Sequence, residues 1–484
     1  MNFLSTILLP VLLLISSFNE NTDKNNNSET YRPQFHFSPE KNWQGAPSGL
    51  VYFENEYHLF YQYNPNGNEP GYSHWGHAIS KDLIHWQYLP VALAPDENSD
   101  DKDPCTLLSG SVIVDQNNTL GKQEGNVPAL LAFYTSQQCG QRLAYSTDKG
   151  RTWKKFEKNP VLPFDAQDQA QNPKVFWHLR SKKWVMVLYR KLSENDNSKG
   201  ISIYNSDNLV DWEWKSHTPG MQDYPDLMEF TVTNRPDEKV WALFMGDGTY
   251  FFGDFDGATF TPTSGKMKSD WGSKYYAPKT WNNIPSADGR VLQMASLHEG
   301  TFTGMPFKGQ MTIPTELSVT KLASGYRLIR KPVSELELLQ DKPDTWTDKN
   351  LIPGINQNIL KKVSGDCLRI TAEFDLKTSD NFGFMLRHSI KKPGVEVLYN
   401  VKRGVLTVFS TTVPLLPKDN KIKLDIIMDR TSLEIFANDG QVSVSDYFEP
   451  DAKSKDVLLF TNGGELGVVQ LDVYQMKSIR DKKE

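Results

Sequence analysis

The sequence has little cysteine, no strong excess of charge of either sign and almost no helical periodicity. Only 3 of its 484 residues are Cys, and Cys105, Cys139 and Cys367 lack the spacing of a metal site. No metal and no organic cofactor is therefore indicated. The 53 basic and 59 acidic residues give a net charge of -6, which argues against nucleic acid and anionic membranes as partners.

Long apolar runs are also scarce. The run from Phe3 to Ile15 is too short to cross a bilayer and resembles the core of a signal peptide, although no Lys or Arg precedes it. We expect a signal peptide at residues 1–18, a disordered polar spacer at residues 19–31 and secretion of the protein. Glycosylation sequons begin at Asn26 and Asn117, as in a secreted glycoprotein.

What the chain does have is a degenerate repeat. A chain of this length favours two domains. Four segments place a polar turn after a strand and an aromatic residue after the turn: Ile79 to Trp86, Tyr145 to Trp153, Tyr204 to Trp212 and Gly253 to Phe260. With a fifth strand pair near residues 275–297, these segments give five sets of short antiparallel strands. The spacing predicts an all-β fold, with a five-bladed β-propeller over residues 32–340.

The C-terminal part shows strand alternation without helices. Residues 341–350 are polar and contain Pro343, so we expect a linker there, followed by a β-sandwich over residues 351–484. Cys105 and Cys139 fall in the same predicted blade and can form a disulfide in an oxidising compartment; three buried free thiols are the alternative.

Strand order predicts the position of a cleft. The innermost strands of a propeller line its channel, and their starts converge at one mouth. In this chain the starts are Ala46, Ser109 to Ser111, Gln171 to Pro173, Asp223 to Asp226 and Lys274 to Tyr276. Among carboxyl groups, the predicted cleft holds Asp223 and Asp226, both from a single blade.

Several runs in the right order resemble glycoside hydrolase family 32, the invertases, inulinases and levanases. They are Asn42 to Gly49, Tyr57 to Pro65, Trp75 to Asp82, Pro173 to Phe176, Met305 to Phe307, Gln310 to Thr312 and Asp429 to Phe436. The resemblance covers nearly the whole chain after the spacer. It implies hydrolysis of fructosyl bonds in sucrose or fructans by three acidic residues.

All three acidic positions are altered. The family nucleophile, the Asp of Trp-Met-Asn-Asp-Pro-Asn-Gly, corresponds to Ala46. The stabilising Asp of Arg-Asp-Pro corresponds to Asn172, with Gln171 in place of the Arg. The acid/base Glu of Glu-Cys-Pro-Asp corresponds to Asp223, which is one methylene shorter. Two further departures are Leu108, where an aromatic is usual, and Lys274, where an Asp is usual.

Other residues are candidates for sugar contact: Trp43, Gln62, Trp75, Ser111, Gln171, Asp226 and Tyr276. Each also has a structural interpretation. Gln62 and Ser111 can satisfy backbone groups between blades, Trp75 can belong to the core, and Asp226 can cap a turn. In the sandwich, Asp429 and Glu434 are expected at the surface or in turns.

Three functions fit the sequence. The first is a secreted pseudoenzyme that retains sugar binding, since no covalent fructosyl intermediate forms without a nucleophile at Ala46. The second is an active β-fructofuranosidase that pairs Asp223 with Asp226 or Glu229. The third is a structural or protein-binding module without sugar affinity. The sequence does not indicate the oligomeric state.

Overall fold

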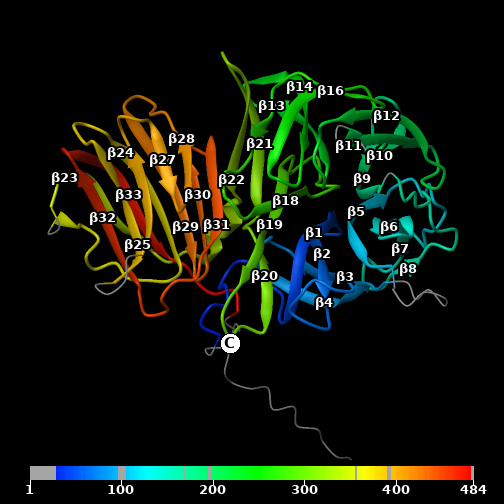
Figure 1. Ribbon diagram of the computed structural model, residues 1–484, viewed down its shortest axis with the longest axis horizontal. Helices are drawn as coiled ribbons and strands as arrows, with labels where there is room; N and C mark the ends of the chain where they lie inside the picture. Colours follow the sequence, from blue (N-terminus) through cyan, green and yellow to red (C-terminus); the bar gives the residue numbers. More distant parts are fainter. Residues whose placement is uncertain are drawn as a thin grey trace, which may run out of the picture.

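The computed structural model describes residues 29–95, 105–167, 169–193, 198–354, 357–389 and 394–480. The expected signal peptide, residues 19–28 of the expected spacer and the Asn26 sequon lie outside these ranges. Two β-rich modules lie side by side, a ring of sheets and a pair of packed sheets (Figure 1). Within the described residues, no helix has the length and apolar character needed to cross a membrane.

The ring is the predicted five-bladed propeller. Each blade consists of short antiparallel strands joined by tight turns, because Asp, Asn and Gly at the repeated turns allow the chain to reverse. The first three blades are β1 (Asn42–Phe53), β2 (Glu56–Asn64), β3 (His74–Ser80) and β4 (Trp86–Leu93); β5 (Leu107–Asp115), β6 (Ala129–Ser136), β7 (Gly140–Ser146) and β8 (Lys154–Lys155); and β9 (Gln171–His178), β10 (Lys183–Lys191), β11 (Lys199–Ser206) and β12 (Glu213–Pro219).

Parallel strand pairing joins the fourth blade to the fifth and the fifth blade to the first. They contain β13 (Asp226–Val232), β14 (Arg235–Phe244), β15 (Thr249–Phe255), β16 (Phe260–Pro262) and β17 (Met267–Lys268), then β18 (Tyr275–Thr280), β19 (Val291–Thr301), β20 (Phe307–Met311), β21 (Thr315–Leu322) and β22 (Gly325–Pro332). Strand β20 runs parallel to β1, with Trp43 opposite Lys308, and β21 pairs with β13. These bridges close the ring.

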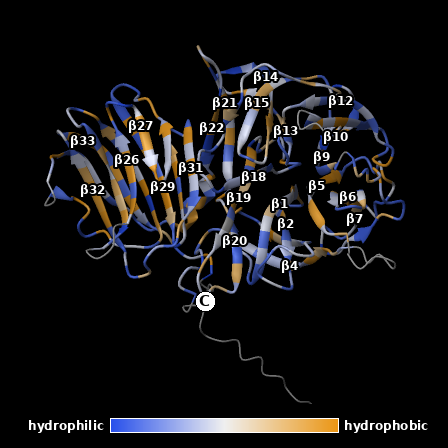
Figure 2. Ribbon diagram, viewed as in Figure 1, coloured by the Kyte–Doolittle hydropathy of each residue, from blue (hydrophilic) through white to orange (hydrophobic). Residues whose placement is uncertain are grey.

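The second module is a β-sandwich. Its six-stranded sheet has the order β23 (Asp344–Leu351), β33 (Leu466–Gln475), β24 (Leu368–Asp375), β29 (Lys421–Asp429), β30 (Ser432–Ala437), β31 (Val442–Tyr447). Its five-stranded sheet has the order β28 (Thr411–Pro414), β27 (Val405–Val408), β26 (Val395–Asn400), β25 (Asn381–His388), β32 (Asp456–Asn462). Apolar residues recur along these strands, whereas the connecting loops are largely hydrophilic (Figure 2).

The prediction of a linker at residues 341–350 is wrong for most of that segment. Residues 344–350 form most of strand β23, which pairs with β33 along the edge of the larger sheet. Their side chains are mostly exposed, which explains why the sequence of this segment is polar although its backbone is part of a sheet. The modules are connected further upstream, through a short 3₁₀ helix, η2 (Ser334–Leu339).

A mixed core joins the two modules. Phe35 and Phe37, which precede β1, pack in one cluster with Leu292 of the propeller and with Ile427 and Phe436 of the sandwich. Burial of such side chains contributes about 1.5–3 kcal/mol each, so the interface resembles the interior of one domain. The two modules are therefore expected to move as a unit.

A buried ionic cluster fixes this interface. His36 contacts Asp429 Oδ2 through Nδ1 at 2.9 Å and Glu434 Oε1 through Nε2 at 2.9 Å, and all three side chains are completely buried. Burial alone would lower the pKa of His36, but its two carboxylate partners raise it to about 9. The prediction that Asp429 and Glu434 lie at the surface or in turns is wrong. Their partner His36 lies almost 400 residues away in the sequence, so no local pattern reveals the buried contact.

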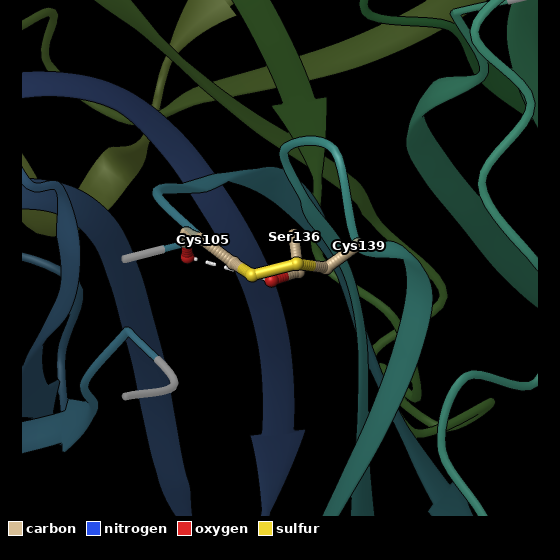
Figure 3. The surroundings of a disulfide bond; sticks show 3 residues. All are labelled: Cys105, Ser136 and Cys139. Atoms are coloured by element: carbon tan, nitrogen blue, oxygen red, sulfur yellow. Dashed lines mark hydrogen bonds between the residues drawn. A yellow bond between two sulfur atoms is a disulfide. The ribbon is translucent and has the colours of Figure 1, made fainter. Parts of the chain in front are cut away.

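Cys105 and Cys139 form a disulfide in the second blade (Figure 3). Cys105 lies just before β5, and Cys139 lies in the turn between β6 and β7, with a Cα–Cα distance of 6.1 Å. The bond thus lies at the cleft end of the blade. Cys367 is the free thiol among the described cysteines, and it is buried.

Candidate functional site

Irregular backbone marks the cleft end of the inner strands. The register shifts near the starts of β1, β5 and β18, and the pairing of β9 shifts beside Gln171. Asn172, Tyr224 and Ala277 also adopt positive φ values, of 60°, 52° and 51°. Bulges and left-handed residues redirect side chains and are common beside functional sites. These irregularities lie at or beside Ala46, Asn172 and Asp223.

Hydrogen bonds connect the nucleophile position to the acid/base segment. The Ala46 amide lies 3.4 Å from Gln62 Oε1 on β2 and donates to it. The Tyr224 hydroxyl donates to the same oxygen, also at 3.4 Å. Gln62 thus connects the first and fourth blades. Ala46, which donates to it, is almost completely buried.

The stabiliser position belongs to the same cluster. Asn172 Oδ1 accepts a hydrogen bond from the Ser109 amide at 3.2 Å, and the Ser109 hydroxyl donates to the Pro47 carbonyl at 3.0 Å. The Asn172 amide donates to Thr135 Oγ1 at 2.8 Å. Blades one, two and three therefore meet around a neutral amide, where the family resemblance implies a carboxylate.

Asp223 is the carboxyl group of the cluster. Its Oδ2 accepts a hydrogen bond from Tyr276 at 3.2 Å, and Tyr276 packs against Tyr224 with ring centroids 5.3 Å apart. Burial raises the pKa of Asp223; the Tyr276 bond opposes this shift and the negative charge of Asp247 adds to it. A carboxyl group with a raised pKa retains its proton nearer neutral pH, as a general acid must.

A cavity of about 470 Å³ opens beside this carboxyl group. Tyr276 and Asp247 line it together with Lys274 and His298, and Trp271 closes it toward the sandwich. Lys274 lies over the ring of Tyr447, with Nζ 5.4 Å from the centroid. The residue that replaces the usual Asp therefore contacts the second module.

The ring of Trp43 covers Gly45, the residue before Ala46. A Cβ atom at Gly45 would lie 2.4 Å from Trp43 Cη2 and 3.1 Å from Gln62 Cβ. Real Cβ atoms do not approach other atoms so closely, so Gly45 cannot gain a side chain unless the indole moves. The residue that the family motif carries as Asn is thus missing, and the Trp43 ring lies in its place.

Two predicted sugar contacts lie in the core instead. Trp75 is completely buried, and its Nε1 donates to the Leu108 carbonyl at 2.8 Å. Ser111 accepts a hydrogen bond from the Val175 amide at 2.9 Å and so links blades two and three. The structural interpretation of these two residues is supported. Gln171 is half-buried at the start of β9.

Asp226 plugs the channel rather than facing the cleft. It is fully buried, lies 2.9 Å from Lys174 Nζ and accepts a hydrogen bond from the Thr280 hydroxyl at 3.0 Å. Lys279 donates to the Pro225 carbonyl at 3.0 Å, and burial lowers its pKa to about 8. Glu229 pairs with Lys239 at 2.6 Å toward the other end of the channel.

These contacts remove Asp226 and Glu229 as partners for Asp223. Asp247 is a carboxylate within electrostatic range of Asp223; it lies in the turn between β14 and β15 and accepts a hydrogen bond from the Thr249 amide. The Gly246 amide donates to the Asp223 carbonyl at 2.7 Å, which places this turn beside the acid/base segment. The glycines flanking Asp247 are its sequence signal, although they are common in loops.

The described residues include no group of three or more His, Cys, Asp or Glu side chains arranged to hold a metal ion.

Known proteins match the chain along nearly its whole length. Residues 36–332 match the model of the glycosyl hydrolases family 32 N-terminal domain, and residues 335–475 match that of the family 32 C-terminal domain. A levanase of Bacillus subtilis is 37% identical over 98% of this chain and 74% of its own length. The extracellular exo-inulinase of Aspergillus awamori is 30% identical, covering 94% and 96%. A crystal structure of exo-inulinase from Aspergillus awamori has a TM-score of 0.84 at 28% identity, covering 94% of this chain and 100% of that one.

Proposed function

The chain belongs to glycoside hydrolase family 32, and from that premise we propose that it binds sucrose or a fructan in its cleft but has lost efficient hydrolysis. The observation that carries the proposal is Ala46. It corresponds to the Asp of the family motif that attacks the anomeric carbon, and a methyl group cannot make that attack. Loss of a catalytic nucleophile typically costs several orders of magnitude in rate.

The rest of the cleft supports binding. Tyr276, which donates a hydrogen bond to Asp223, lines a cavity large enough for a sugar, and Trp43 offers an aromatic surface over Gly45. The relatives named levanase and exo-inulinase suggest β-fructosyl polymers as the ligand class. Asn172 can hydrogen-bond a hydroxyl but supplies no charge to an oxocarbenium-like transition state.

A second candidate function is slow hydrolysis of terminal fructosyl bonds. Two observations favour it: the sequence similarity to the named hydrolases, and the burial of Asp223, which raises the pKa of a carboxyl group that can donate a proton to the leaving group. Water or Asp247 would then have to supply the missing nucleophilic assistance.

One experiment separates the candidates. Fructose release from sucrose, inulin and levan is measured with purified protein, with Asp223→Asn and with Asp207→Asn as a control, since the Asp207 side chain is 76% exposed on a distant turn. We expect no release above background, together with a calorimetric heat of sugar binding. Release that disappears only in Asp223→Asn would establish the second candidate, and absence of both release and binding would leave a structural module.

Restoration tests the geometry. The combined change Ala46→Asp, Asn172→Asp, Asp223→Glu and Gln171→Arg should yield fructose release at least roughly 100-fold above the starting protein, because the bulges that orient these positions are present. A restored variant that binds sugar without any gain in hydrolysis would show that the Trp43 ring over Gly45 keeps the substrate away from residue 46.

We further propose that the protein is secreted. The apolar run near the N-terminus supports this, as does the extracellular location in the name of the Aspergillus awamori relative. A reporter fused behind residues 1–31 should reach the medium of a secreting host. Retention of the reporter inside the cell would contradict secretion.

A further inference from the structure

The end of the propeller channel opposite the cleft contains a second cavity. It encloses about 490 Å³ and lies where the inner strands β5, β9, β13 and β18 end, so the plug formed by Lys174 and Asp226 separates it from the cleft. We call it the far-mouth cavity. Its volume lies within the range of small-molecule sites, about 300–1,000 Å³.

Tryptophan is concentrated in its wall. Four of the chain's 12 Trp residues line the cavity: Trp177, Trp184, Trp241 and Trp281. Trp177 is 39% exposed, and Trp184 supports it at a centroid distance of 5.2 Å in an edge-on arrangement. A large aromatic ring that is partly exposed and packed against a second ring provides a surface for the apolar face of a ligand.

The wall also contains an unsatisfied polar group. Trp184 is 5% exposed, and its indole Nε1–H has no hydrogen-bond acceptor among the described residues. Buried donors of this kind are rare in folded proteins and cost about 1–3 kcal/mol when unpaired. This donor is shielded from solvent, so its cost belongs to the wall and is not a contact that the cavity offers.

Most charged groups around the cavity have partners within the protein, although Arg180 is 70% exposed and lies 4.0 Å from Glu229. Lys174 pairs with Asp226 at 2.9 Å and Lys239 pairs with Glu229 at 2.6 Å. Arg290 contacts Asp288 at 2.7 Å and Glu335 at 2.9 Å. An anionic ligand would have to compete with these carboxylates, so the site favours a neutral molecule. Gln116 and Asn283 add amide groups at the rim.

An exposed aromatic platform, rim amides and paired charges together suit a neutral oligosaccharide. We propose that the far-mouth cavity is a second sugar site that binds two or three sugar units with one ring stacked on Trp177. The choice of a fructan as its ligand rests on the proposed function of the cleft. A chain with sites at both mouths could bind two segments of one polymer, with a gain in avidity set by the segment joining them.

Calorimetric stoichiometry with inulotriose tests the proposal, using protein from a bacterial host so that Asn117, beside the cavity, carries no glycan. The native protein should bind two equivalents. Trp177→Ala should bind one, with the second site weakened roughly 10–30-fold, as for loss of an aromatic anchor. Trp177→Phe should be intermediate, which guards against misfolding. Trp214→Ala is the matched control, because Trp214 is 51% exposed on β12 and does not line the cavity.

A cleft variant separates this proposal from the previous one. Tyr276→Ala should remove the other equivalent and leave the site at Trp177 intact. A single native equivalent that Tyr276→Ala removes and Trp177→Ala preserves would refute the far-mouth site and leave the cleft function standing. A single equivalent lost only in Trp177→Ala would support the far-mouth site and refute sugar binding in the cleft.

Discussion

The ionic cluster between the modules predicts an unusual loss of stability in mild alkali. In the folded protein, the carboxylates of Asp429 and Glu434 raise the pKa of His36 from 6.5 to about 9. A base with a raised pKa contributes its full stabilisation below pH 6.5 and loses it as the pH rises through 9. The shift corresponds to about 3 kcal/mol, at 1.36 kcal/mol for each pH unit.

The change His36→Gln should abolish this pH dependence. Gln keeps a hydrogen-bond donor but carries no charge, so Asp429 and Glu434 lose the cation between them, and Arg330 stays 3.8 Å from Glu434. We expect the variant to be about 3 kcal/mol less stable than the native protein at pH 6 and nearly equal to it at pH 10. Urea unfolding followed by tryptophan fluorescence at pH 6, 8 and 10 measures the difference.

A second histidine provides the control. His85 pairs with Asp82 at 2.8 Å, but its side chain is 38% exposed, so solvent screens the pair. His85→Gln should therefore change the unfolding midpoint little at any of the three pH values. If the stability curves of His36→Gln and the native protein ran parallel from pH 6 to pH 10, the assignment of a charged His36 would be wrong.

Three further changes have clear expected outcomes. Replacing Cys105 and Cys139 by Ser should lower the free energy of unfolding by about 3–4 kcal/mol, because the disulfide closes a loop with a sequence separation of 34; an unchanged urea midpoint under non-reducing conditions would contradict this. Asp226→Asn should cost about 3–5 kcal/mol, since Lys174 keeps a buried charge without its partner; a loss below 1 kcal/mol by the same assay would refute the plug. Gly272→Ala should loosen the module interface, because its Cβ would lie 1.8 Å from a carbonyl oxygen of β31; limited proteolysis identical to that of the native protein would argue against this close contact.

Local sequence patterns predicted the architecture well. The polar turns followed by aromatic residues, such as Tyr145 to Trp153, encode blade edges within a few residues, so the propeller could be inferred before any tertiary contact was known. Strand order also predicted that Ala46, Asn172 and Asp223 lie near the starts of inner strands, which are β1, β9 and β13, whereas their catalytic roles stay a prediction. Hydrogen bonds through Gln62 and Ser109 connect these positions to one another.

The errors came from side chains whose roles depend on distant partners. Asp226, Asp429 and Glu434 looked like cleft or surface residues because charged groups are rarely buried without a partner. Their partners, Lys174 and His36, are separated from them by 52 and by almost 400 positions, beyond any local pattern. Strand β23 was missed because an exposed edge strand has no apolar alternation to reveal it.

The parallel pairing of β1 with β20 has a consequence for synthesis of the protein. Blades two and three each form a separate four-stranded sheet, so each can form as soon as its own strands leave the ribosome. The first strand pairs with β2 on one edge, but its other edge must wait for a partner more than 260 residues later, where Asn42 lies opposite Phe307. The nascent chain therefore carries an unclosed edge through most of translation, and the cleft takes shape only when that late strand emerges.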